Sequence, residues 1–185
     1  MRLTLSSESV RNTVMTNESG QVLYKTSTPF RLGVRTTTIY KVVPNTNPND
    51  MQDCLDAIGE IEWHLFGTSI MRLHGEEMKT DRFIPRHGFT GRKRTFTGPD
   101  GRPYRWDMHS SVVVLSQDDA TRRELARSYR RCLGILGPKR EPSLDMHPDL
   151  MPIVDTVVLT FVYVEKLRMD KEEQRKRAAA SGGGP

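Results

Sequence analysis

The longest apolar run of this chain reads Met151-Pro-Ile-Val-Asp-Thr-Val-Val-Leu-Thr-Phe-Val-Tyr-Val-Glu-Lys-Leu167. Its middle shows neither the alternation of a half-buried strand nor the one-sided stripe of a surface helix, and a helix that is apolar all round is buried on every side. Asp155 and Glu165 make the run shorter than the roughly 18 apolar residues of a membrane span. It therefore predicts a central helix enclosed by the rest of the chain. The predicted core positions of this helix are Val154, Val157, Val158, Phe161, Val162 and Val164.

The same run is rich in residues that favour strands, and a strand buried on both faces is the alternative. Two features favour a helix. Asp149 is a candidate N-cap, and Pro152 stands in the first turn, where its missing N–H costs nothing. Residues 168–180 are almost all good helix formers with opposite charges four positions apart, and they continue the helix until Ser181 and three glycines end it.

The rest of the chain predicts antiparallel β structure, with about ten short strands separated by turn residues. The clearest hairpin joins 91–97 to 102–108 through Gly98-Pro-Asp-Gly101. Residues 53–59 fit a short helix or the start of a strand. Residues 118–131 combine a helical composition with strand-like alternation. The predicted strands are 2–5, 13–16, 21–27, 36–43, 60–66, 69–73, 91–97, 102–108, 111–116 and 143–146.

The composition fits one domain with its own core, because the chain has 185 residues, of which 36% are apolar and 28% charged. Cys54 and Cys132 lack CxxC spacing, and the N-terminus lacks a signal peptide. These features predict reduced thiols that act as small hydrophobic residues in an intracellular protein. The net charge of +5 permits attraction to anionic lipid or nucleic acid without requiring it.

No stretch carries a catalytic motif, and the five histidines lack the spacing of metal ligands. Asp155 and Glu165 interrupt the apolar run, and one hypothesis makes them acids or bases inside the fold. The preferred interpretation places Asp155 in the first turn, stabilised by the helix dipole, and Glu165 where the helix emerges. We therefore expect no enzymatic activity, no metal and no cofactor.

Basic residues give the clearest functional signal. With Tyr104 and Trp106 nearby, two arginine-rich groups are suited to holding the phosphates of lipid headgroups or nucleic acid. The alternative is a solvated strand face. The first group is Arg86, Arg92, Lys93, Arg94, Arg102 and Arg105, and the second is Arg122, Arg123, Arg127, Arg130 and Arg131. The predicted headgroup site is Arg92, Lys93, Arg94, Arg102 and Arg105.

Three segments, 17–29, 36–40 and 153–168, resemble an uncharacterised domain family of mushroom-forming fungi. That family is similar in pattern to the tubby C-terminal, LURP-one-related and phospholipid-scramblase group. The resemblance implies a mainly β fold, an antiparallel barrel of about twelve strands enclosing a hydrophobic C-terminal helix, with 125–131 as a strand. In tubby proteins this fold binds phosphoinositide headgroups through basic side chains, but none of those positions can be aligned with this chain.

We accordingly expect one domain over 1–170, with its central helix at about 150–168, followed by a charged helical extension over 171–185. The predicted function is a non-enzymatic binding module for anionic membrane lipids, cytoplasmic or peripheral to a membrane, with no nucleic-acid partner. The alternative is a protein-interaction domain that docks through the charged helix 168–180. An enzyme is the third hypothesis, and a deep pocket of converging His and carboxylate groups would favour it.

Overall fold

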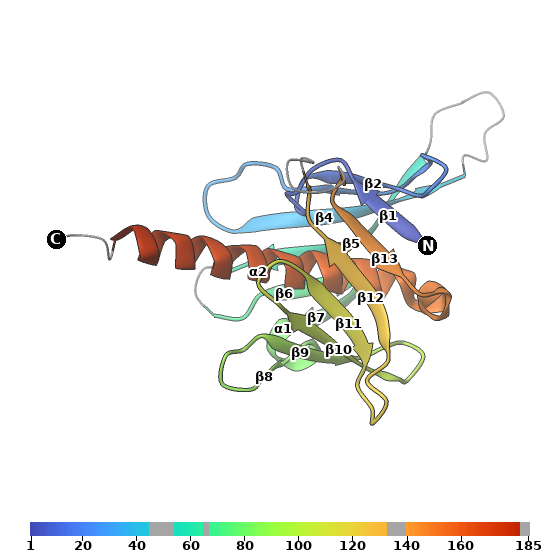
Figure 1. Ribbon diagram of the computed structural model, residues 1–185. Helices are drawn as coiled ribbons and strands as arrows, with labels where there is room; N and C mark the ends of the chain where they lie inside the picture. Colours follow the sequence, from blue (N-terminus) through green and yellow to red (C-terminus); the bar gives the residue numbers. More distant parts are fainter. Residues whose placement is uncertain (45–53, 65–66, 133–139, 182–185) are drawn as a thin grey trace.

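A computed structural model describes residues 1–44, 54–64, 67–132 and 140–181 (Figure 1). It contains strands, two α-helices and one 3-10 helix. The helices are α1 (Thr80–Phe83), η1 (Pro148–Ile153) and α2 (Val154–Ser181). The strands are β1 (Arg2–Leu5), β2 (Thr13–Thr16), β3 (Val22–Ser27), β4 (Arg35–Val43), β5 (Cys54–Trp63), β6 (Ile70–Leu73), β7 (Glu76–Lys79), β8 (Arg86–His87), β9 (Lys93–Thr97), β10 (Pro103–Met108), β11 (Val113–Gln117), β12 (Glu124–Tyr129) and β13 (Ser143–Met146).

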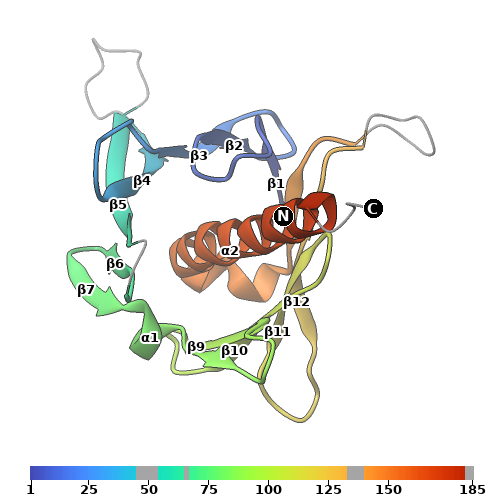
Figure 2. The same cartoon turned by 90° about the vertical axis from the view of Figure 1, so that its left-hand side faces the viewer.

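All described strands belong to one antiparallel sheet that curves around α2 (Figure 2). Its order runs from β7 back through β6, β5, β4, β3 and β2 to β1, then through β13, β12, β11, β10 and β9 to β8. The sheet is not closed, since β7 and β8 are its edges, and α1 joins them along the chain. The mainly β prediction is confirmed as an open sheet around a C-terminal helix.

The strand predictions fail chiefly at the two edges. β7 and β8 were not predicted, because both are short and polar and lack an apolar alternation. Such charged, short strands are typical of sheet edges, where they discourage pairing with other chains. The undecided residues 54–59 form the first part of β5, and the conflict over 118–131 resolves as strand β12. Residues 65–66 of the predicted strand 60–66 lie outside the described residues.

The central helix is confirmed, and α2 is buried on all sides from Thr156 to Glu165. Val157, Val158, Val162 and Val164 have no exposed surface, and Phe161 is 1% exposed. The predicted core position Val154 is only half-buried, because it lies in the first turn at the mouth of a cavity. This continuous apolar surface packs against strands from both halves of the sheet, including β5, β10 and β11.

The predicted start of the helix was wrong. Asp149 is not an α-helical N-cap, because residues from Pro148 to Ile153 first form the 3-10 helix η1. The side chain of His147 caps η1 by accepting a hydrogen bond from the Asp149 N–H. Pro152 lies inside η1, and α2 begins two residues later.

Polar groups on the buried helix have partners in the sheet. The indole of Trp106 donates to the Thr160 hydroxyl at 3.1 Å, and that hydroxyl donates to the Thr156 carbonyl at 2.8 Å. Asp155 lies in the first turn as predicted. It also accepts hydrogen bonds from the Tyr24 hydroxyl at 2.6 Å and from the Lys41 ammonium at 3.0 Å.

Glu165 does not lie where the helix emerges, contrary to the prediction. It is 6% exposed and forms an ion pair at 2.7 Å with Arg168, which is 3% exposed. The helix leaves the sheet about two turns later, where side chains from Glu173 onwards are exposed.

Cys54 and Cys132 are both exposed and free, so neither is a buried small hydrophobic residue as predicted. Among the described residues, no helix combines the length and apolarity needed to cross a membrane.

Candidate functional site

The candidate site begins with the turn between β8 and β9. Gly88 and Gly91 both have positive φ angles, +71° and +59°, which favour glycine, and the Gly91 N–H donates to the Gly88 carbonyl at 3.2 Å. Lys171 of α2 reaches this turn, and its ammonium donates to the carbonyls of Thr90 at 3.0 Å and Gly91 at 3.1 Å. The turn is therefore attached to the helix at the point where the helix leaves the sheet.

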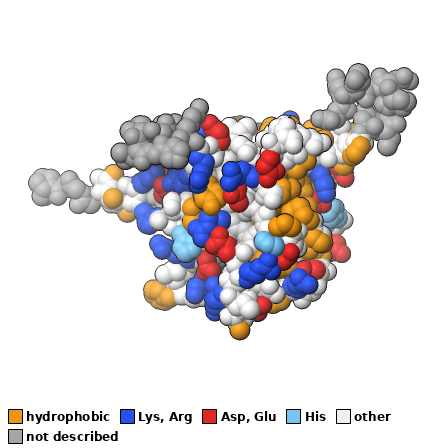
Figure 3. All heavy atoms as spheres, turned by 45° about the vertical axis from the view of Figure 1, so that its right-hand side comes forward, with side chains coloured by type: hydrophobic (Ala, Val, Ile, Leu, Met, Phe, Trp, Pro, Cys, Tyr) orange, Lys and Arg blue, Asp and Glu red, His pale blue; other side chains and the backbone are white. Residues whose placement is uncertain are grey.

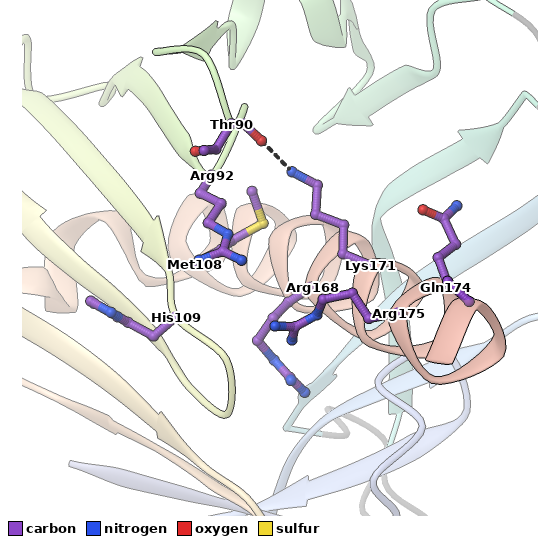
Figure 4. Close-up of a pocket in the computed structure, with 9 residues that line it drawn as sticks. Thr90, Arg92, Met108, His109, Arg168, Lys171, Gln174 and Arg175 are labelled. Atoms are coloured by element: carbon purple, nitrogen blue, oxygen red, sulfur yellow. Dashed lines mark hydrogen bonds between the residues drawn. The ribbon is translucent and has the colours of Figure 1, made fainter. Parts of the chain in front are cut away.

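A pocket of about 410 Å³ lies between this turn, the end of β10 and the emerging part of α2. Figure 4 shows Arg92 and Arg175 extending into this space from the turn and from the helix, and the Lys171 contact with Thr90 beside them. The volume is within the usual range of small-ligand sites. The pocket is lined by Thr90, Arg92, Met108, His109, Arg168, Lys171, Gln174, Arg175 and Ala178.

The pocket is basic, and none of its lining residues is acidic. Arg168 is already neutralised, because it contacts Glu165 at 2.7 Å and Glu172 at 2.9 Å. Arg92, Lys171 and Arg175 form no ion pair within the part of the chain that the structure describes. Three cations therefore share one hollow without a counter-charge, which favours an anionic ligand.

The excess of positive charge affects the pKa of the Lys171 ammonium. Its pKa lies below the usual lysine value because of partial burial and, to a smaller extent, because of the nearby charges of Arg94, Arg92 and Arg86. An anion in the pocket would reverse the repulsive contribution and favour the charged ammonium.

The structure separates the five residues of the predicted headgroup site. Arg92 lines the pocket, and Lys93 is exposed on the opposite face of β9. Arg105 lies between Asp107 at 2.8 Å and Asp118 at 3.6 Å. Arg102 lies at the far end of the β9–β10 hairpin, 3.9 Å from Asp100.

Arg94 has a packing role rather than a free charge. Its guanidinium lies over the Tyr163 ring of α2 at 5.8 Å, and its Nη1 donates to the Ile84 carbonyl at 3.3 Å. Burial lowers its pKa. Arg94 therefore packs against α2 and is not one of the residues that line the pocket.

The second arginine group is largely neutralised by acidic neighbours. Figure 3 shows the same pattern on the face it presents, where Lys and Arg side chains are interspersed with Asp and Glu. These ion pairs leave less positive charge for an anionic ligand here than in the pocket. The pairs are Arg123–Asp149, Arg127–Glu124, Arg130–Glu172 and Arg131–Glu141.

Sequence reasoning missed the helix contribution to the pocket. Arg168, Lys171, Arg175 and Ala178 follow one another at spacings of three and four, which places them on one face of a helix. That periodicity was available in the sequence. Without the fold, nothing indicated that this face meets the turn that carries Arg92.

Searches of curated proteins and of solved structures returned no match to this chain. The model of a family of unknown function, DUF6593, matches residues 8–170, which include Arg92 and Arg168 of the pocket. The match spans most of the sheet and the whole buried part of α2, and the chain belongs to this family.

Proposed function

We propose that this protein is a non-enzymatic binding module whose basic pocket holds the headgroup of an anionic membrane lipid of the phosphoinositide type. The observation that carries the proposal is the group of three cations, Arg92, Lys171 and Arg175, around a hollow of about 410 Å³ without an acidic lining residue. Guanidinium and ammonium groups are the side chains that bind phosphate best, through charge-assisted hydrogen bonds.

The position of the pocket suits a ligand at a membrane surface. Arg92 and Arg175 are exposed, so they reach an anionic surface without a change in the core. Basic residues close to an anionic bilayer contribute roughly 1 kcal/mol each to membrane attachment. This supports a protein that is peripheral to a membrane.

The test is co-sedimentation with liposomes that contain graded amounts of a phosphatidylinositol phosphate, at low and at physiological salt. R92S/R175S removes two exposed charges of the pocket, and K25S/R122S removes two exposed charges elsewhere, so both variants lower the formal net charge from +5 to +3. We expect binding that increases with headgroup charge and weakens about tenfold or more in R92S/R175S. K25S/R122S should bind nearly as the wild type does.

Equal weakening in both variants would indicate attraction by net charge alone and would contradict a pocket. No binding by the wild type at either salt would contradict the lipid ligand. Thermal melts of both variants control for folding, because neither removes a buried side chain.

We also infer that the fold is a relative of the tubby C-terminal barrel and that the open edges β7 and β8 approach one another. The antiparallel sheet around a C-terminal helix supports this inference. Hydrogen exchange tests it: the β7 amides that do not bond to β6 should exchange slowly if β8 covers this edge, and fast exchange of those amides would contradict closure.

A protein partner is the second candidate, and a different groove favours it. About 950 Å³ of space lies between the segment before β4 and the other side of α2. It contains exposed Phe30 and Leu32 together with charges of both signs, as interfaces between proteins often do. If this groove is the interface, L32E should lose a purified partner that R92S/R175S still binds. The reverse pattern would contradict it.

A further inference from the structure

The turn that bounds the pocket also carries the most exposed aromatic side chain of the described residues, since the Phe89 side chain is fully exposed. We propose that this turn, residues 88–91, inserts Phe89 into the apolar edge of an anionic bilayer while the adjacent pocket holds a lipid headgroup. This inference rests on the proposed function and adds a second, apolar contact with the same membrane.

The turn is built to hold Phe89 outward. Gly88 and Gly91 adopt positive φ angles, and a hydrogen bond of 3.2 Å closes the turn between them. Lys171 binds the carbonyls of Thr90 and Gly91 from the helix side. Because the backbone is already held, insertion of the ring needs little further ordering of the chain.

The charges around Phe89 favour an anionic membrane over an apolar protein surface. Residues 86–93 contain three exposed Arg or Lys residues and no acid. Arg92 lines the basic pocket, and Lys93, the next residue of the chain, is exposed but does not line it. An exposed aromatic ring flanked by cationic side chains suits the interface of an anionic bilayer, where acyl chains lie directly beneath the anionic headgroups.

A second exposed aromatic residue, Phe30, provides the contrast. It is 81% exposed, but it borders the groove whose helix residues include Asp170 and Glu173. At about 100° per residue, Asp170 and Glu173 lie on the side of α2 opposite Lys171 and Arg175. One flat membrane cannot contact both sides at once. The groove beside Phe30 mixes three acidic residues with its Arg and Lys residues, whereas the pocket beside Phe89 contains no acidic residue.

The experiment compares F89A with F30A on vesicles that contain a phosphatidylinositol phosphate and, in parallel, on a soluble inositol phosphate. We expect F89A to bind vesicles roughly tenfold more weakly, because an inserted aromatic ring is lost. It should bind the soluble headgroup as the wild type does, and F30A should match the wild type in both assays.

Vesicle binding by F89A equal to that of the wild type would overturn insertion and leave the headgroup pocket intact. Absence of both vesicle and headgroup binding by the wild type would overturn the proposed function as well. A direct measure of depth uses F89W and F30W with lipids brominated on their acyl chains. Additional quenching in F89W alone is the expected result, and none in F89W would contradict insertion.

Discussion

A single buried arginine joins the core of this protein to its proposed binding surface. Arg168 is 3% exposed, pairs with Glu165 at 2.7 Å, and donates from Nη1 to the Ser110 carbonyl at 3.0 Å. Burial raises the pKa of Glu165, while the hydrogen bonds from Arg168 oppose that shift. The charge on Glu165 therefore depends on its partner.

Replacing Arg168 with methionine should destabilise the fold by about 3–5 kcal/mol, because it leaves the Glu165 carboxylate buried without a partner. Urea denaturation followed by circular dichroism measures this change. R175M on the exposed part of the same helix is the control, expected within about 0.5 kcal/mol of the wild type. Equal stability of R168M and R175M would contradict a structural role for the pair.

Glu172 makes the stability of the fold depend on pH. Hydrogen bonds from Lys176, Arg168 and Arg130 lower its pKa from 4.5 to about 2. Because the pKa is lower in the folded state, the carboxylate stabilises the fold fully above about pH 4.5, and the contribution disappears as pH falls towards 2.

E172Q should therefore lose about 1–2 kcal/mol at pH 7 and progressively less below pH 4.5. The measurement is the difference in free energy of unfolding between wild type and E172Q across that range. E173Q, which removes an exposed carboxylate, is the control and should change little at any pH. A difference that stays constant with pH would contradict the assignment.

At the scale of elements, α2 determines the fold because its apolar surface packs against strands from both halves of the sheet, including β5, β10 and β11. V158D would place a charge at a position without exposed surface, whereas A179D places the same charge on an exposed turn of the same helix. We expect V158D to lack a cooperative thermal transition and A179D to melt like the wild type. A cooperatively folded V158D would mean that α2 is not central.

Most elements could be predicted from local sequence patterns. Each element that was not predicted was missed for a physical reason. The apolar run of α2 and the alternation in β10 depend on burial, which the sequence records directly. The exit of α2 was misplaced because Glu165 and Arg168 neutralise each other inside the protein. The edge strands β7 and β8 lack an apolar face, so they left no pattern.

At the scale of the whole molecule, the candidate site could be predicted only in part. Sequence clustering identified Arg92, but it also grouped Arg102 and Arg105, which are paired with acids elsewhere on the sheet. The missing cations, Lys171 and Arg175, lie about 80 residues further along the chain and were assigned to a docking helix. Tertiary contact between α2 and the β8–β9 turn creates the pocket.

Headgroup binding should also depend on pH. An anion favours the charged form of Lys171, whose pKa is lowered in the free protein by burial and by neighbouring cations. Headgroup binding should therefore take up protons and weaken as pH rises through the alkaline range below 10.5. Affinity that is independent of pH up to that value would indicate that Lys171 does not contact the ligand.

The most direct test of the pocket is calorimetric titration of a soluble inositol trisphosphate into the wild type, R92S/R175S and K25S/R122S at physiological salt. No membrane is present, so net attraction to a surface and insertion of Phe89 cannot contribute. We expect saturable binding by the wild type and by K25S/R122S, and at least tenfold weaker binding by R92S/R175S. Equal affinity in all three proteins, or no binding by the wild type, would contradict it.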